Sequence, residues 1–206
     1  MNPAISLVRA YLRLNGYFTA TEVPVIKKSK EGLYYESTDI DMLALRFPRA
    51  VHMVAQGRPG PEDDLFLPPD PDLDIPADAV DFMIAEVKEG KPRLNPNLLE
   101  EDTLYRALIR FGFCPPERLE RAVRELQGAG EAWVRDDGNA VPSRVRIVAF
   151  GDGERNHGDG FTVVPLKHVA DYVKDHLKRY RHLLRPVRVT DPTLGLLHLL
   201  EKLEED

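Results

Sequence analysis

Three charged residues in two apolar segments have the types and spacing that metal-dependent hydrolysis requires. Glu86 and Lys88 end an apolar run that begins at Val80, and Asp41 lies within the segment DIDMLAL. Because side chains alternate along a strand, Glu86 and Lys88 would project from one face while Val87 points away. Carboxylates from two neighbouring strands can hold Mg²⁺ or Mn²⁺, and a lysine beside the ion can orient or deprotonate an attacking water, or neutralise phosphate charge. The pattern therefore predicts a site for phosphodiester hydrolysis.

A simpler interpretation of the same residues is structural. Asp41 and Lys88 would form a cross-strand ion pair at the rim of a sheet, and an exposed pair of this kind contributes about 0 to 1 kcal/mol. Glu-X-Lys alone is a common pattern, so the argument depends on the elements that carry it.

Hydrophobic periodicity predicts those elements. Helical spacing covers residues 3–15, and the alternating segments YFTATEVPVIKK and LYYESTDIDMLALRF indicate two strands joined by a turn. The apolar run before Glu86 is a third strand. The remaining patterns predict, in order, helices over 95–113 (with Asn97 as N-cap) and 114–130, strands EAWVRD, SRVRIVAFG and FTVVPL, and helices over 166–184 and 191–206. Interleaved strands and helices predict an α/β fold, a single domain with a mixed central β-sheet flanked by helices.

Composition sets the limits of the domain and of its environment. One domain would span residues 1–206, with a Pro/Asp-rich insertion at about 48–79 and a helical part at about 165–206, since proline blocks helices and central strands. The single cysteine, Cys114, excludes a disulfide framework and a multi-cysteine metal site. No apolar run is long enough to cross a membrane and the N-terminus does not resemble a signal peptide, so a cytoplasmic protein is expected.

Charge is unevenly distributed along the chain. The net charge of -6 argues against non-specific coating of nucleic acid, but a local basic patch is compatible with it. Tyr172 and Tyr180 are interleaved with basic residues in the predicted helix after residue 166, which indicates either a phosphate-contacting face or an ordinary solvated helix face. The candidate nucleic-acid-binding residues are Lys174, Lys178, Arg179, Arg181 and Arg185. Trp133 is predicted to be a core aromatic, and His168 a structural histidine.

The order DIDMLAL, a connection, then DFMIAEVK resembles the PD-(D/E)XK nuclease superfamily, which includes restriction-enzyme cores and archaeal Holliday-junction resolvases. The resemblance implies a restriction-endonuclease-like fold, a Mg²⁺ or Mn²⁺ cofactor and DNA as substrate. It implies that Asp41 and Glu86 are metal ligands, that Lys88 is the catalytic lysine, and that the carbonyl of Val87 completes the metal shell.

The sequence departs from that family's pattern in its first helix. Many members carry a glutamate there, whereas residues 3–15 contain no acid, and Glu22 or Glu36 are the substitutes that the sequence offers. The expected function is a metal-dependent nuclease that hydrolyses DNA phosphodiester bonds. The alternative is a catalytically inactive nuclease-fold module that binds nucleic acid or protein. The sequence leaves open whether the chain forms a homodimer.

Overall fold

A computed structural model describes residues 2–50, 69–135, 141–154, 156–158, 160–181 and 191–203. Within these residues, seven strands form one mixed sheet: β1 (Phe18–Lys28), β2 (Tyr34–Arg46), β3 (Val80–Val87), β4 (Glu131–Val134), β5 (Ser143–Gly151), β6 (Asn156–Gly158) and β7 (Phe161–Pro165). The order is β1-β2-β3-β5-β7-β6, and β4 pairs with β5 beside that path. Strand β3 is antiparallel to β2 and parallel to β5, which confirms the predicted mixed α/β sheet.

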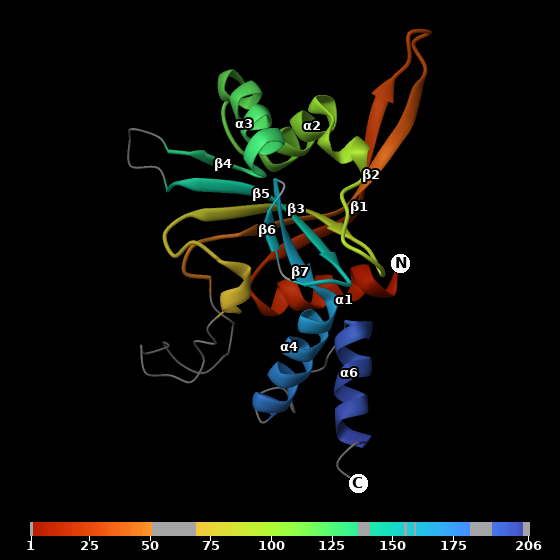
Figure 1. Cartoon of the computed structure of the whole chain (residues 1–206), viewed down its shortest axis with the longest axis vertical. Coiled ribbons are helices and arrows are strands. Elements are labelled where there is room, and N and C mark those ends of the chain that lie inside the picture. Colours follow the sequence, from red (N-terminus) through yellow and green to blue (C-terminus); the bar gives the residue numbers. More distant parts are fainter. Residues whose placement is uncertain are drawn as a thin grey trace.

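Helices cover both faces of this sheet (Figure 1). On one face lie α1 (Pro3–Leu14), α4 (Leu166–Arg179) and α6 (Pro192–Leu203), which pack over a core that includes Met83 and Ala85 of β3. On the other face lie α2 (Glu101–Phe111) and α3 (Pro116–Ala129), over a second core that includes Phe82 and Ile84. Alternation along β3 therefore decides which helical layer each of its side chains meets.

Two helix starts follow local sequence signals. Asn2 accepts a hydrogen bond from the N–H of Ala4 at 2.7 Å and caps α1, whose first residue is proline. Asp191 caps α6 as predicted, because its Oδ1 accepts from the N–H groups of Thr193 and Leu194 at 3.0 and 3.2 Å.

The β1/β2 hairpin extends beyond the rest of the sheet as a two-stranded arm (Figure 1). Pairing of β2 with β3 covers only Met42–Arg46, whereas β1 pairs with β2 as far as Tyr34. The first half of β2 is accordingly exposed and the second half is buried. This arm leaves the sheet at Asp41, beside the end of β3.

The connection between β3 and α3 differs from its prediction. Helix α2 begins at Glu101, and a separate 3-10 helix, η2 (Pro96–Leu99), precedes it. Asn97 is therefore not the N-cap of α2. Asn95 caps η2 instead, because its Oδ1 accepts from the N–H of Asn97 at 3.1 Å.

Residues 51–68 of the predicted insertion lie outside the described part of the chain, and 69–79 contain both exposed and buried residues. The 3-10 helix η1 (Pro71–Leu73) follows Asp70, and Leu73 is fully buried in the core beneath α1 and α4. Trp133 was predicted in the core but is 36% exposed, and Arg135 Cζ and Arg144 Cζ lie 5.7 and 5.6 Å from its ring centroid. No helix among the described residues is long and apolar enough to span a bilayer.

Candidate active site

Asp41 lies at the point where β2 and β3 separate. Met42 pairs with Ala85 as the last register position, and beyond it the Asp41 carboxylate accepts a hydrogen bond from the N–H of Val87 at 2.7 Å. A side chain thus supplies the acceptor that a backbone carbonyl would supply if the ladder continued. This contact brings the Asp41 carboxylate to the end of β3.

The Lys88 ammonium contacts both predicted carboxylates. It forms an ion pair with Glu86, and its Nζ lies 3.8 Å from Asp41 Oδ2. The side chain of Glu86 is 3% exposed, whereas those of Asp41 and Lys88 are 15% and 36% exposed. Two carboxylates therefore converge on one cationic group, in which the glutamate is buried and the lysine is partly exposed to solvent.

Burial is the main influence on the charge of Glu86. It raises the pKa of Glu86 above its usual value, the hydrogen bond from Lys88 offsets this only in part, and the negative charge of Asp41 adds to the rise. Burial lowers the pKa of Lys88, but the hydrogen bond to Glu86 and the nearby carboxylate charges outweigh it, so this pKa also lies above its usual value. Lys88 is therefore an ammonium at neutral pH.

The donor set fits a hard divalent cation. Carboxylate oxygens are the ligands that Mg²⁺ and Mn²⁺ take, and Asp41 and Glu86 already converge on the charge of one cation. The backbone N–H of Val87 donates a hydrogen bond to Asp41. Participation of the Val87 carbonyl stays a prediction.

One of the two substitute acids, Glu22, lies on the strand that neighbours the strand of Asp41. Glu22 falls between the register pairs Thr21–Met42 and Val23–Ile40, so it is opposite Asp41 on β1, and its φ of 52° is the left-handed conformation. A left-handed non-glycine residue inside a strand is unusual and redirects its side chain.

The other substitute does not approach the site. Glu36 lies in the exposed arm, about 17 Å from Asp41 at the usual rise per strand residue. Asp39 is the acid that sequence reasoning did not assign: its negative charge contributes to the raised pKa of both Glu86 and Lys88. The signal was present, because Asp39 and Asp41 are two residues apart in a strand.

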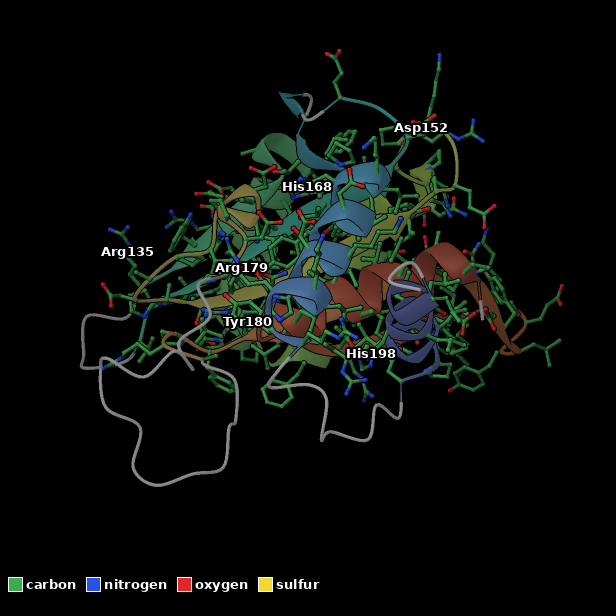
Figure 2. All side chains as sticks on the ribbon, turned by 90° about the horizontal axis from the view of Figure 1, so that it is seen from below. Arg135, Asp152, His168, Arg179, Tyr180 and His198 are labelled. Atoms are coloured by element: carbon green, nitrogen blue, oxygen red, sulfur yellow. The ribbon has the colours of Figure 1, made fainter. Side chains whose placement is uncertain are left out.

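The predicted nucleic-acid-binding residues on α4 lie in the opposite helical layer. Glu86 alternates with Phe82 and Ile84 toward α2 and α3, whereas α4 packs through Val169 and Val173 on the other face. Figure 2 shows His168 toward one end of α4 and Arg179 and Tyr180 at the other. The structure therefore does not bring Lys174, Lys178, Arg179 or Arg181 together with Glu86, and Arg185 lies outside the described residues.

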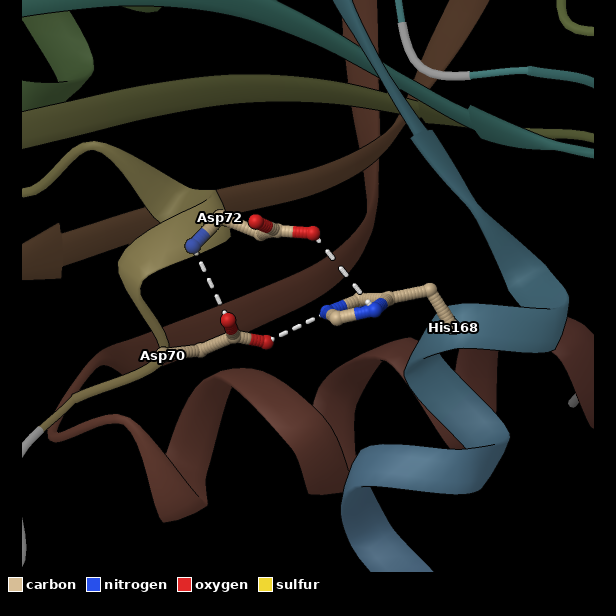
Figure 3. Close-up of side chains that lie close together, drawn as sticks. All are labelled: Asp70, Asp72 and His168. Carbon is tan, nitrogen blue, oxygen red and sulfur yellow. Dashed lines mark hydrogen bonds and ion pairs between the residues drawn. The ribbon is translucent and has the colours of Figure 1, made fainter.

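A second polar cluster lies beneath α4 (Figure 3). His168 Nε2 is 2.6 Å from Asp70 Oδ2, and its Nδ1 is 3.5 Å from Asp72 Oδ2. Asp70 also accepts from the buried Tyr11 hydroxyl at 2.7 Å and from the N–H of Asp72 at 2.9 Å. Although two aspartates and a histidine can ligate metal, here the carboxylates contact opposite ring nitrogens. These hydrogen bonds and ion pairs hold η1 against α1 and α4.

Asp70→Ala is expected to lower the free energy of unfolding by about 2 to 3 kcal/mol, because it leaves the buried Tyr11 hydroxyl without an acceptor. Urea denaturation followed by circular dichroism measures this. Asp72→Ala is the matched control, since its side chain is one-third exposed and its loss should cost less than about 1 kcal/mol. Equal costs for the two variants would contradict the conclusion that Asp70, rather than Asp72, stabilises this cluster.

Comparisons of the chain with protein-family models, with curated proteins and with solved structures found no match in any of the three. The fold and the site therefore define the class: a mixed α/β protein that holds a carboxylate–lysine cluster where an antiparallel strand pair separates. Function is argued from that cluster, because a fold alone does not imply an activity.

Proposed function

We propose that the protein is a Mg²⁺- or Mn²⁺-dependent nuclease of restriction-endonuclease-like fold that hydrolyses DNA phosphodiester bonds at Asp41, Glu86 and Lys88. The observation that carries the proposal is the convergence of the two carboxylates on Lys88 at the end of β3. The element order supports it: α1, the antiparallel strands β1, β2 and β3, a helical crossover, and then β5 parallel to β3.

Each residue has a separate task in the proposed reaction. Asp41 and Glu86 would hold the ion, and the ion would lower the pKa of a bound water and stabilise charge on phosphate oxygens. Lys88 is protonated at neutral pH, so it would place a positive charge beside the phosphate rather than remove a proton from water. The exposed side of Lys88 is the side from which the phosphate would approach.

A catalytically inactive nuclease-fold module is the second candidate, and two observations favour it. Helix α1 contains no acid, and Asp41 Oδ2 is already occupied by the N–H of Val87. In such a module Asp41 would act only as the residue that ends the β2/β3 ladder, and Lys88 as the counter-charge of buried Glu86. Mn²⁺ titration separates the candidates, since only an active site loses metal affinity in Asp41→Asn.

Lys88→Ala is expected to lower DNA cleavage by at least about 10²-fold with little change in fold, because it removes the charge that would oppose the phosphate. The measurement is cleavage of linear, branched and flapped DNA with Mn²⁺. Lys91→Ala is the control, since Lys91 is an exposed lysine in the loop that follows β3. Absence of cleavage above that of Lys88→Ala on every substrate would leave the inactive module as the function.

A further inference from the structure

A groove of about 480 Å³ lies on the same face of the sheet as Glu86, between the root of the β1/β2 arm and helix α2. Its floor is aliphatic, and its α2 wall carries two arginines one helical turn apart. Val23, Val25, Ile40 and Leu43 form the floor, and Arg106 and Arg110 stand on the wall. Figure 1 shows the arm and α2 side by side at this place.

The groove lies beside the candidate active site, although Asp41, Glu86 and Lys88 do not line it. Ile40, which lines it, precedes Asp41 in the chain, and Leu43 shares the α2/α3 face with Phe82 and Ile84. A nucleic-acid strand bound in the groove would therefore lie on the same face of the sheet as Glu86 and next to Asp41 in the chain. The basic residues of α4 do not border this groove, because they lie in the other layer.

The two arginines are available to an anionic ligand. Arg106 and Arg110 are exposed, and the contact of Arg106 with Asp102, at 3.4 Å, joins two half-exposed side chains within one helix. An exposed pair of this type contributes little, so phosphate can replace the aspartate at small cost. Guanidinium groups also match phosphate geometry well.

The aliphatic floor selects the form of the nucleic acid. A duplex presents phosphates at its surface but stacks its bases inside, so it offers nothing apolar to this floor. An unpaired strand presents phosphates and base faces together, and single-strand sites combine a basic groove with apolar or aromatic platforms. Further along the arm, Tyr34 and Tyr35 are 73% and 50% exposed, and Lys28 Nζ lies 5.5 Å from the Tyr34 ring centroid.

We infer that the groove between the arm and α2 binds single-stranded DNA, with Arg106 and Arg110 on its phosphates and with unstacked bases on the aliphatic floor. The inference rests on the proposed function for the role of Asp41 and Glu86, and it narrows the substrate class to DNA with an unpaired strand. It also replaces α4 by α2 as the phosphate-contacting helix of this site.

Paired glutamine variants on the two helices test the inference. The binding of fluorescent 20-nucleotide single strands and of the matching duplex is measured by anisotropy over a range of salt concentrations, with Ca²⁺ as the ion. Arg106→Gln/Arg110→Gln should weaken single-strand binding at least about tenfold and lower the salt-dependence slope by about 1.4, the value for two lost contacts. Lys178→Gln/Arg179→Gln, also two exposed helix positions, should stay within about twofold of the wild type.

Each other outcome has a defined meaning. Equal losses of binding in the two double variants, or a larger loss in the α4 variant, would refute the groove as the binding site. Tighter binding of the duplex than of the single strand would refute the assignment to single-stranded DNA. Cleavage kinetics with Mn²⁺ separate this from the function itself: the α2 variant should raise KM and leave kcat unchanged. If the wild type cleaves DNA and the α2 variant has an unchanged KM, DNA binding in the groove is refuted and the proposed nuclease function is not. If the wild type neither binds nor cleaves DNA, the groove and the proposed function are both refuted.

Discussion

Glu86→Gln is expected to change activity and stability in opposite directions. Cleavage with Mn²⁺ should fall by at least about 10²-fold, because the amide removes the negative charge of a proposed metal ligand. The free energy of unfolding at pH 7 should rise by on the order of 1 kcal/mol, because glutamine has nearly the same shape as glutamate but carries no charge into the buried position. Glu86 is 2% exposed, so little water solvates its carboxylate.

The raised pKa of Glu86 sets the pH dependence of this effect. Its folded-state pKa lies above the usual value, mainly through burial, so the folded protein binds this proton more tightly than the unfolded chain. Its contribution to stability is therefore greatest below the ordinary glutamate pKa and declines as the pH rises through the raised value. The stability gain of Glu86→Gln should be present at pH 7 and vanish near pH 4.

Urea denaturation at the two pH values measures this, with Glu89→Gln, an exposed neighbour, as control. A variant that loses stability at pH 7 would show that the ion pair with Lys88 outweighs the burial of Glu86. A variant that gains stability and keeps full cleavage would remove Glu86 from the metal site while leaving its burial as described.

Short-range patterns were sufficient to predict the cluster itself. Alternation places Glu86 and Lys88 on one face, and an antiparallel neighbour brings Asp41 to the same end. Those are consequences of side-chain alternation within a strand and of the tendency of consecutive strands to pair. The same reasoning predicted the N-cap at Asp191, since capping is also local.

The positions of the helical layers were not predictable in this way. The amphipathic pattern of α4 shows that it buries one face, but not which face of the sheet receives it, so the sequence did not show that its basic residues lie in the layer opposite Glu86. The contact of Asp70 with His168 joins residues far apart in the sequence, and no spacing rule connects them. Trp133 is about one-third exposed, and its ring contacts two arginines, a pairing that the apolar pattern of its segment does not indicate.

A buried ion network at the opposite end of β3 holds the sheet together. Asp81 is fully buried, and its carboxylate accepts from Arg144 Nε and from Arg146 Nη2, both at 2.8 Å. The Tyr17 hydroxyl donates to the same carboxylate, and burial raises the pKa of that tyrosine. One carboxylate thus balances two guanidinium groups that are each 5% exposed, and it joins the start of β1 to β3 and β5.

Asp81→Asn is expected to lower the free energy of unfolding by about 3 to 5 kcal/mol, because it leaves two buried positive charges without their shared partner. Asp74→Asn is the matched control: it also removes a carboxylate from Arg144, but its side chain is 72% exposed and the loss should be below about 1 kcal/mol. Urea denaturation at pH 7 measures both. Asp81 lies about 17 Å from Glu86 along β3, so cleavage per folded molecule should not change. A loss of activity without a loss of stability would show that the two ends of β3 are coupled, which nothing in their contacts provides.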